Sequence, residues 1–283
     1  MVLPKPPISN NEFLIWQLLI EERCGLYFRA NKSEYLSSKL WQRTKLLGIE
    51  TYNNYYNYIV FNPGGKQEWE KLIELLVVNE TSFFRHSSSF DALANSIIPK
   101  LLKDTSKAKT PIKAWSAGCA TGEEAYSIAM TLLDLSEAHN LEVIVLGTDI
   151  SELVLEKARN GVYKPTVLKQ IPPYYKEKYL DFVKEGVDYL YKIKSKVKSI
   201  VKFTKVNLNR LIDYSIPEQD IIFCQNVLIY FQHQQQIKLI TELSQRLTLG
   251  GFLFLGPGEV VELKVEGLQK LAIDDCLIYQ RIK

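Results

Sequence analysis

The most chemically specific feature of the sequence is a turn of small residues followed by two carboxylates. Residues 115–124 read WSAGCATGEE and join a predicted strand to a predicted helix. Small residues such as Ala117 and Gly118 let a ligand approach the backbone closely. Glu123 and Glu124 would repel a phosphate at the helix start, but they would attract a ligand carrying an ammonium and a sulfonium. The turn therefore favours S-adenosylmethionine over a nucleotide phosphate.

The two glutamates have a second interpretation, because carboxylates also stabilise the N-terminus of a helix through its dipole. We expect one residue in each role, with Glu123 on the ligand and Glu124 at the helix start.

Asp149 is a further acidic residue whose position suggests chemistry. It directly follows residues 142–148, which read EVIVLGT and predict a β-strand. An acidic residue at the carboxyl end of this strand typically accepts hydrogen bonds from both ribose hydroxyls of an adenosine. The alternative is a cap on the helix predicted at 151–160, and the two interpretations stay open.

Alternating strands and helices must position these residues. Strands are predicted at 112–116, 142–148, 220–224 and 252–255, and helices at 123–137, 151–160 and 232–247. Such alternation predicts an α/β fold with a mostly parallel, Rossmann-like sheet. A last strand at 276–281 is expected to close the sheet as an antiparallel edge.

Residues 162–205 interrupt the alternation. Lysines alternate with aliphatic and aromatic residues over 190–206, which predicts a half-exposed antiparallel sheet with a basic outer face. Residues 161–210 carry 12 basic and 4 acidic side chains, although the whole chain has a net charge of only +3. We therefore expect a small inserted antiparallel β-subdomain. Its charge favours acidic partners, such as helices with clustered glutamates, and the alternative is a solvated lysine-rich surface without a partner.

The first 86 residues predict a helical domain with a linker motif, followed by the catalytic domain at 87–283. Phe13, Trp16, Leu19 and Ile20 repeat at helical spacing, and no β-type alternation competes with them. A chain of 283 residues is long enough for these two parts.

Composition narrows the function classes. The cysteines are far apart and the three histidines lack ligand spacing, so we expect no metal site and a reducing compartment. The N-terminus does not resemble a signal peptide, and no apolar run is long enough for a bilayer, which predicts a cytoplasmic protein without membrane insertion. No spare apolar helix face is apparent, which favours a monomer.

Taken in order, the motifs resemble those of the chemotaxis-receptor glutamate O-methyltransferases, the CheR-type family. They are VNETSFFR at 78–85, the WSAGCATGEEAYS turn from 115, GTDIS at 147–151, VNL at 206–208 and CQNVLIYF at 224–231. The resemblance runs from about residue 12 to the end. It implies an S-adenosylmethionine-dependent methyltransferase with a helical domain, a Rossmann-like domain and an inserted β-subdomain.

The resemblance also implies roles for individual residues. Arg85 and Tyr230 are implied at the reaction centre, where Arg85 would hold the acceptor carboxylate through a charge-assisted bond. Glu123 would bind the methionine amino group and Asp149 the ribose. The full set of implied cofactor residues is Asn79, Thr81, Arg85, Ala117, Gly118, Glu123, Asp149, Asn207, Leu208, Gln225 and Asn226. S-adenosylhomocysteine would be the product, and acidic, glutamate-bearing chemoreceptor helices the partner, with no nucleic acid expected.

Two positions depart from the family pattern. Gln225 stands where the family usually has arginine, and residues 256–259 read GPGE where the family usually has Gly-His-Ser-Glu. These departures keep two alternatives open. One is a degenerate S-adenosylmethionine-binding or docking module without turnover. The other is a methyltransferase for another acceptor such as RNA, with the basic segment as its phosphate footprint.

Overall fold

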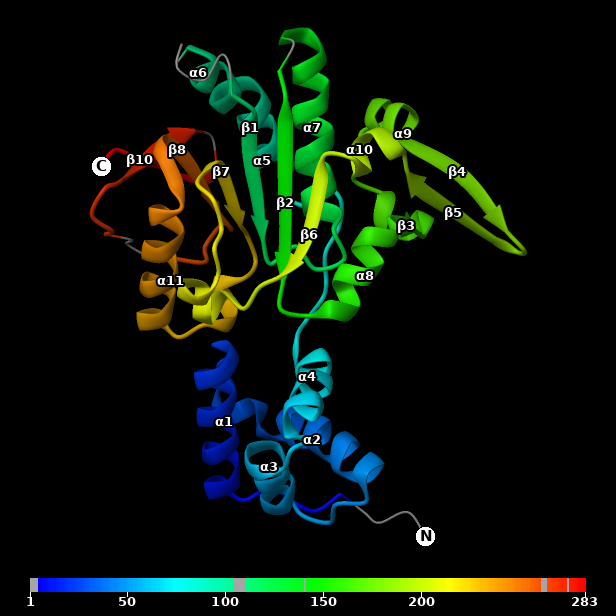
Figure 1. Cartoon of the computed structure of the whole chain (residues 1–283), viewed down its shortest axis with the longest axis vertical. Coiled ribbons are helices and arrows are strands. Elements are labelled where there is room, and N and C mark those ends of the chain that lie inside the picture. Colours follow the sequence, from blue (N-terminus) through cyan, green and yellow to red (C-terminus); the bar gives the residue numbers. More distant parts are fainter. Residues whose placement is uncertain (1–4, 104–109, 140, 261–263, 274) are drawn as a thin grey trace. The chain divides into compact units, whose positions relative to one another are not determined.

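The computed structural model describes residues 5–283 except 104–109, 140, 261–263 and 274 (Figure 1). Two compact units make up the chain. The first comprises Met1–Val78 with Tyr230–Gln232, and the second comprises Asn79–Ile229 with His233–Lys283. Within the described residues, no helix is both long and apolar enough to cross a membrane.

The first unit is helical. A capping box begins its first helix: the Ser9 hydroxyl accepts from the Glu12 amide at 3.3 Å, and the Glu12 carboxylate accepts from the Ser9 amide at 2.9 Å. Gly25 ends that helix in the left-handed conformation. The elements are α1 (Asn10–Cys24), η1 (Ala30–Lys32), α2 (Ser33–Leu47), α3 (Tyr52–Phe61) and α4 (Gly65–Leu76).

A buried ion pair joins three helices of this unit. Glu68 of α4 is 3% exposed and accepts two bonds of 2.7 Å from the Arg43 guanidinium of α2. The Tyr55 hydroxyl of α3 donates to the same carboxylate at 2.9 Å. Every oxygen of this buried carboxylate therefore has a partner, as a buried charge requires.

We expect Glu68→Gln to lower the free energy of unfolding by about 2 kcal/mol, because the half-buried Arg43 guanidinium would lose one charge-assisted acceptor. Urea unfolding followed by circular dichroism measures this difference. Glu50→Gln, at an exposed position of the same unit, is the control and should change little. Equal stabilities of the Glu68 and Glu50 variants would contradict the prediction.

A mixed sheet forms the centre of the second unit. Its order is β6-β2-β1-β7-β8-β10-β9 in the described residues, with parallel pairing from β6 to β8 and antiparallel pairing of β10 with both neighbours. The bounds are β1 (Ile112–Ala117), β2 (Val143–Asp149), β6 (Val201–Lys205), β7 (Gln219–Cys224), β8 (Leu247–Leu255), β9 (Leu268–Ile273) and β10 (Cys276–Arg281). The predicted α/β, Rossmann-like fold class is confirmed.

The strand order reverses between β1 and β7, so the carboxyl ends of these two strands define the switch point where ligands bind in open α/β sheets. Helix α7 packs on β1 and β2, α8 on β2 and β6, and α11 on β8. The helical elements of this unit outside the insertion are α5 (Ser87–Ala92), η2 (Leu93–Ile97), α6 (Ile98–Lys103), α7 (Glu123–His139), α8 (Glu152–Asn160), η4 (Leu208–Asp213), η5 (Leu228–Tyr230, its last residue in the first unit) and α11 (His233–Gln245).

Two strand assignments made from the sequence were wrong. Val201–Lys205 was expected in the inserted sheet, but it forms β6 and pairs in parallel with β2. Cys276–Arg281 was expected at the edge, but β9 pairs with its outer side, so Leu268–Ile273 forms the edge. The partner of β6 lies far away in sequence, whereas β9 directly precedes β10 but carries little strand signal, so local alternation identifies neither pairing.

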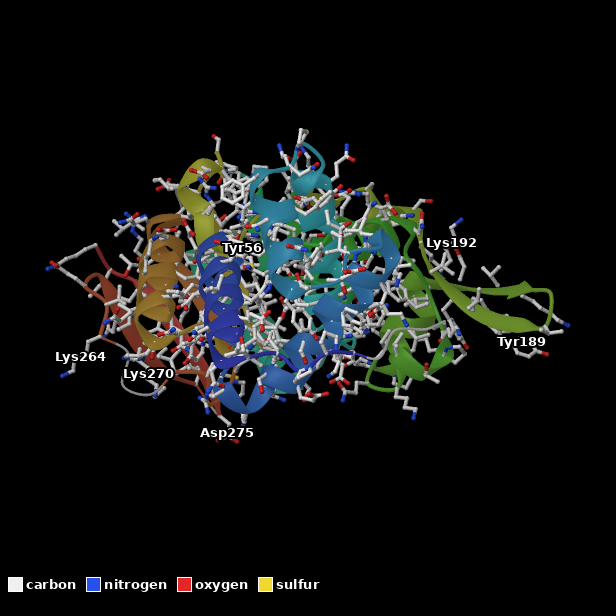
Figure 2. All side chains as sticks on the ribbon, turned by 90° about the horizontal axis from the view of Figure 1, so that it is seen from below. Tyr56, Tyr189, Lys192, Lys264, Lys270 and Asp275 are labelled. Atoms are coloured by element: carbon white, nitrogen blue, oxygen red, sulfur yellow. The ribbon has the colours of Figure 1, made fainter. Side chains whose placement is uncertain are left out.

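The insertion contains a three-stranded antiparallel sheet of order β3-β5-β4. Its elements are β3 (Val162–Tyr163), η3 (Pro165–Leu168), α9 (Pro173–Tyr179), β4 (Leu180–Glu185), β5 (Asp188–Ile193) and α10 (Ser195–Lys198). The rings of Phe182 and Tyr189 stack at 5.7 Å on the β4–β5 hairpin, where Tyr189 lies near the tip (Figure 2). An antiparallel inserted sheet is therefore present, although it is shorter than predicted.

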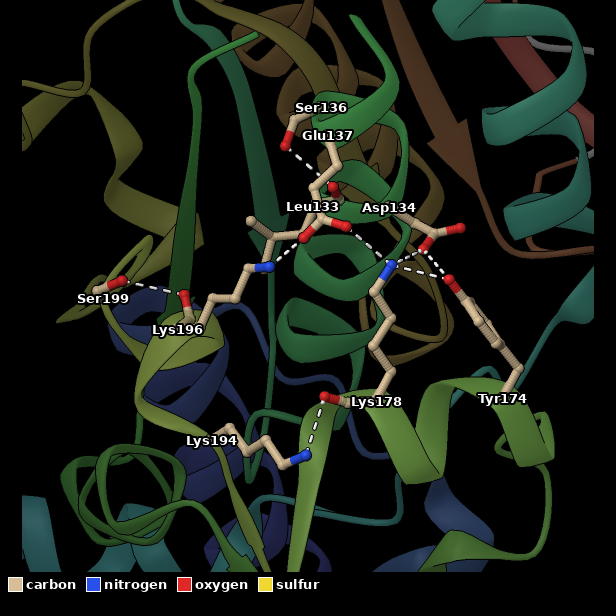
Figure 3. A network of polar contacts seen from close by, with 9 residues as sticks. All are labelled: Leu133, Asp134, Ser136, Glu137, Tyr174, Lys178, Lys194, Lys196 and Ser199. Carbon is tan, nitrogen blue, oxygen red and sulfur yellow. Dashed lines mark hydrogen bonds and ion pairs between the residues drawn. The ribbon is translucent and has the colours of Figure 1, made fainter. Parts of the chain in front are cut away.

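A polar network attaches the insertion to α7 (Figure 3). The Lys178 ammonium of α9 pairs with Asp134 and, at 3.0 Å, with Glu137, while the Tyr174 hydroxyl donates to Asp134 at 2.9 Å. Lys196 of α10 also pairs with Glu137, and these two lysines lower the pKa of that carboxyl. Several lysines of the basic segment therefore serve internal contacts.

Candidate active site

The turn after β1 has a backbone that only small residues allow. Gly118 and Gly122 have φ values of +87° and +95°, and Ala120 has +46°. The amides of Gly118 and Cys119 both donate to the Thr148 carbonyl at 2.8 Å, which joins the turn to β2. A Cβ on Gly118 would lie 2.5 Å from a Val227 methyl, so a side chain there cannot fit without displacement.

Asp149 ends β2 beside this turn. One carboxylate oxygen accepts from the Ala120 amide at 2.9 Å and the other from the Ser151 amide at 3.0 Å. The N-cap of α8 is Ser151, whose hydroxyl accepts from the Val154 amide. Asp149 is therefore not the N-cap. Its backbone bonds instead fix the carboxylate at the carboxyl edge of the sheet, and its contact with a ribose stays a prediction.

Glu123 and Glu124 point to different partners. Glu123 is 3% exposed and accepts from the Thr121 hydroxyl at 2.7 Å, and burial raises its pKa. Glu124 accepts from the Ser116 hydroxyl of β1 at 2.7 Å. Burial raises the pKa of Glu124 to about 7, although the Ser116 bond opposes the shift. Glu124 thus ties the first turn of α7 to β1, and its stabilisation of the helix start stays a prediction.

The raised pKa of Glu124 predicts a pH-dependent stability. Because its folded pKa of about 7 exceeds the ordinary 4.5, its contribution to stability is complete below about pH 4.5 and is lost as pH rises towards 7. We expect Glu124→Gln to reduce the decline in free energy of unfolding across this window. Urea unfolding at several pH values measures it. Glu156→Gln, at an exposed position, is the control, and identical pH slopes for Glu124→Gln and the unaltered protein would contradict the prediction.

The linker motif lines one wall of a pocket of about 440 Å³ in the second unit. Phe83 and Phe84 are buried in the core of this unit, and the Phe84 amide donates to the Ser127 hydroxyl of α7 at 3.0 Å. Residues 79–86 thus belong to the second unit, although the sequence joins them to the helical domain. The pocket is lined by Asn79, Glu80, Thr81, Ser82, Arg85, Thr121, Glu123 and Val167.

This pocket brings together four residues predicted from the family resemblance, Asn79, Thr81, Arg85 and Glu123. Arg85 is exposed and donates to the Glu80 carbonyl at 2.9 Å. Ala117 and Gly118 lie at the carboxyl end of β1. The Val206 amide donates to the Asp149 carbonyl, at the end of β2, at 2.9 Å. Asn207 and Leu208 directly follow Val206 in the chain.

Gln225 and Asn226 follow β7 at the switch point. The side-chain Nε2 of Gln225 donates to the Ser89 hydroxyl at 2.9 Å and to the Leu255 carbonyl at 3.3 Å. Its side chain is buried in the fold, so it replaces a family arginine without leaving a polar group unpaired. Asn226 has a φ of +60°, and its carboxamide oxygen lies 2.9 Å from the His86 Nε2.

Tyr230 groups with the first unit, where the Tyr27 amide donates to its carbonyl at 2.8 Å. Its role at the reaction centre stays a prediction.

Sequence reasoning missed several residues of the pocket and its surroundings, namely Glu80, Ser82, Thr121, Val167, His86 and Glu259. Glu80, Ser82 and Thr121 sit inside recognised motifs, so polarity within a motif is the signal that could have found them. Among the described residues, no group of His, Cys, Asp and Glu could hold a metal ion.

Comparison with known proteins agrees with this geometry. Residues 79–275 match the family model described as CheR methyltransferase, SAM binding domain, and residues 11–77 match its all-alpha domain. The chain is 34% identical over 260 residues to a chemotaxis protein methyltransferase of Borreliella burgdorferi, covering 90% of this chain and 89% of the relative. The Escherichia coli relative of the same description is 31% identical, covering 89% and 85%.

Chemotaxis protein methyltransferase 2 of Vibrio cholerae is 28% identical over 254 residues, which cover 89% of this chain and 86% of the relative. The predicted S-adenosylmethionine-binding methyltransferase domain and the helical domain before it are confirmed by the two family matches. The chain belongs to the CheR methyltransferase family.

Proposed function

We propose that this protein transfers a methyl group from S-adenosylmethionine to glutamate side chains of a chemoreceptor. The observation that carries the proposal is a pocket in which the linker motif and the glutamate of the cofactor turn meet, within a chain of the CheR family. The relatives over most of its length are chemotaxis protein methyltransferases.

The residues present fit a cationic cofactor. Glu123 offers a buried carboxylate at the pocket wall, which suits an ammonium group better than it suits a phosphate. Asp149 presents an acceptor at the end of β2. When bound, S-adenosylmethionine supplies an electrophilic methyl on a sulfonium.

The chemistry needs positioning more than proton transfer. A glutamate acceptor has an ordinary pKa of about 4.3 and is already ionised at neutral pH, so no general base is required. Arg85 at the pocket wall holds the acceptor carboxylate through charge-assisted bonds, and Tyr230 orients it. Holding nucleophile and methyl in line removes most of the entropic barrier.

We further propose that the protein acts as a monomer in the cytoplasm on the acidic cytoplasmic helices of its receptor. Lysines of the insertion that face solvent complement such a surface, because opposite potentials steer association. Lys192, on the hairpin in Figure 2, is one of them.

The test is methylation of chemoreceptor cytoplasmic fragments with S-adenosylmethionine labelled in the methyl group. Label released as methanol by mild alkali would mark carboxyl methyl esters and support the proposal. Receptor fragments with the acceptor glutamates changed to alanine are the control. Alkali-stable label on RNA would favour the RNA acceptor, and cofactor binding without turnover on any acceptor would favour the docking module.

A further inference from the structure

A buried carboxylate outside the pocket lining connects two loops of the site. We propose that Glu259 is a positioning residue that holds residues 226–228 against the cofactor turn. The inference rests on the proposed function, because it assigns the residue that prepares the same site for S-adenosylmethionine.

Glu259 lies in the turn after β8 and is 8% exposed. Its Oε2 accepts from the Gly256 amide at 2.7 Å, and its Oε1 accepts from the Leu228 amide at 3.1 Å. A Cβ on Gly256 would lie 2.3 Å from Oε2, so the carboxylate occupies the space that a side chain would need. The glycine therefore admits the carboxylate, and the carboxylate ties the end of β8 to the loop after β7.

The held segment is strained and touches the cofactor turn. Asn226 adopts a φ of +60°, which costs a residue with a Cβ free energy that its surroundings must supply. His86 contacts its carboxamide from the linker side at 2.9 Å. Val227 lies over Gly118 so closely that a Cβ there would meet its methyl at 2.5 Å. Any relaxation of residues 226–228 would therefore change the surface of the turn.

Charge strengthens this connection. Bonds from backbone amides to a carboxylate are stronger than neutral ones, and Leu228 begins the short helix η5, whose first amides lack helical partners. Burial raises the pKa of Glu259, and the amides of Gly256, Asn226, Ile229 and Leu228 oppose the shift. The residue uses both oxygens for the backbone and so acts through residues 226–228, without needing to touch substrate.

Glu259→Gln tests the proposal, because its amide offers one acceptor oxygen and turns an NH₂ donor towards the second backbone amide. Calorimetric titration with S-adenosylmethionine and S-adenosylhomocysteine should show both affinities reduced about tenfold, in a variant that circular dichroism shows to be folded. Glu259→Asp keeps two acceptor oxygens and should lose less. Glu266→Gln, at a side chain that is 92% exposed, is the matched control.

A double-mutant cycle separates positioning from general support of the fold. Asn226→Gly removes the strain at this residue, because glycine adopts positive φ readily, so Glu259→Gln should weaken binding less in that background. An equal loss in both backgrounds would overturn the proposal. Weaker binding of the sulfonium cofactor alone would overturn it too, since that would indicate a direct effect of charge.

Cofactor binding by the unaltered protein distinguishes failure of the proposed function from failure of the inference about Glu259. Absence of cofactor binding by the unaltered protein would remove the proposed function and this inference with it. Equal binding by the unaltered protein and Glu259→Gln would remove only the inference.

Discussion

Arg85→Ala is expected to lower kcat for receptor methylation by at least about 100-fold, the loss typical when one donor to reacting oxygens is removed. Arg85 lines the pocket with Thr81 and Glu123, and its guanidinium donates to the Glu80 carbonyl at 2.9 Å. Because the side chain is exposed, the fold should survive the change. Initial rates with labelled cofactor, at saturating cofactor and receptor fragment, measure the effect.

Two variants sharpen the Arg85 test. Arg85→Lys keeps the charge but loses the planar pair of donors that matches a carboxylate, so its rate should lie between those of the unaltered protein and Arg85→Ala. Arg159→Ala removes a guanidinium that pairs with Glu152 on α8, and it should keep nearly full activity. Full activity of Arg85→Ala would remove this residue from the reaction centre.

Asp149→Ala is expected to weaken S-adenosylhomocysteine binding by at least about 100-fold. The estimate follows from two ribose bonds to a carboxylate, each contributing about 1.5–3 kcal/mol. The bonds from the Ala120 and Ser151 amides already fix the carboxylate in place, so little ordering is needed when the ligand arrives. Calorimetry on the folded variant measures the loss.

A ligand without ribose hydroxyls separates direct contact from support of the turn. The unaltered protein should bind adenosine more tightly than 2′,3′-dideoxyadenosine, and Asp149→Ala should bind both equally. Asp181→Ala, at a carboxylate that is 60% exposed on the hairpin, should keep the preference. A preference that survives in Asp149→Ala would show that the carboxylate only supports the turn.

Elements with a strong local signal could be predicted from the sequence. Residues 221–224 are a continuous apolar run, and Gln219–Cys224 forms a wholly buried strand. Residues 142–148 are β-branched and aliphatic for the most part and precede Asp149, and Val143–Asp149 forms β2. In such segments the hydrophobic pattern and the turn residues favour the same structure, so tertiary context adds only the pairing partner.

Elements without a distinct local signal of their own could not be predicted. Val201–Lys205 has the same alternation as the hairpin strands, but the sheet that it joins depends on the open edge of β2. Leu268–Ile273 has mostly exposed and half-exposed side chains, which carry little strand signal, and β10 recruits it to the sheet.

The site divides in the same way. Glu123 and Asp149 could be selected because each sits at a strand end or helix start that the sequence itself marks. The contact of His86 with Asn226 joins residues 140 positions apart, and the bond of Glu259 to Leu228 spans 31. No local pattern encodes these contacts, and neither does it encode the positive φ of Asn226.

Within the insertion, residues 161–193 begin and end at nearly one point. The Ile193 amide donates to the Gly161 carbonyl at 2.9 Å, and Val162 pairs with Lys192. Between these ends, the β4–β5 hairpin adds no strand to the seven-stranded sheet. Each doubling of a loop's length costs only about 0.6 kcal/mol in closure entropy. The hairpin can therefore be lengthened, trimmed or exchanged during evolution while the sheet and the Glu123 turn keep their geometry.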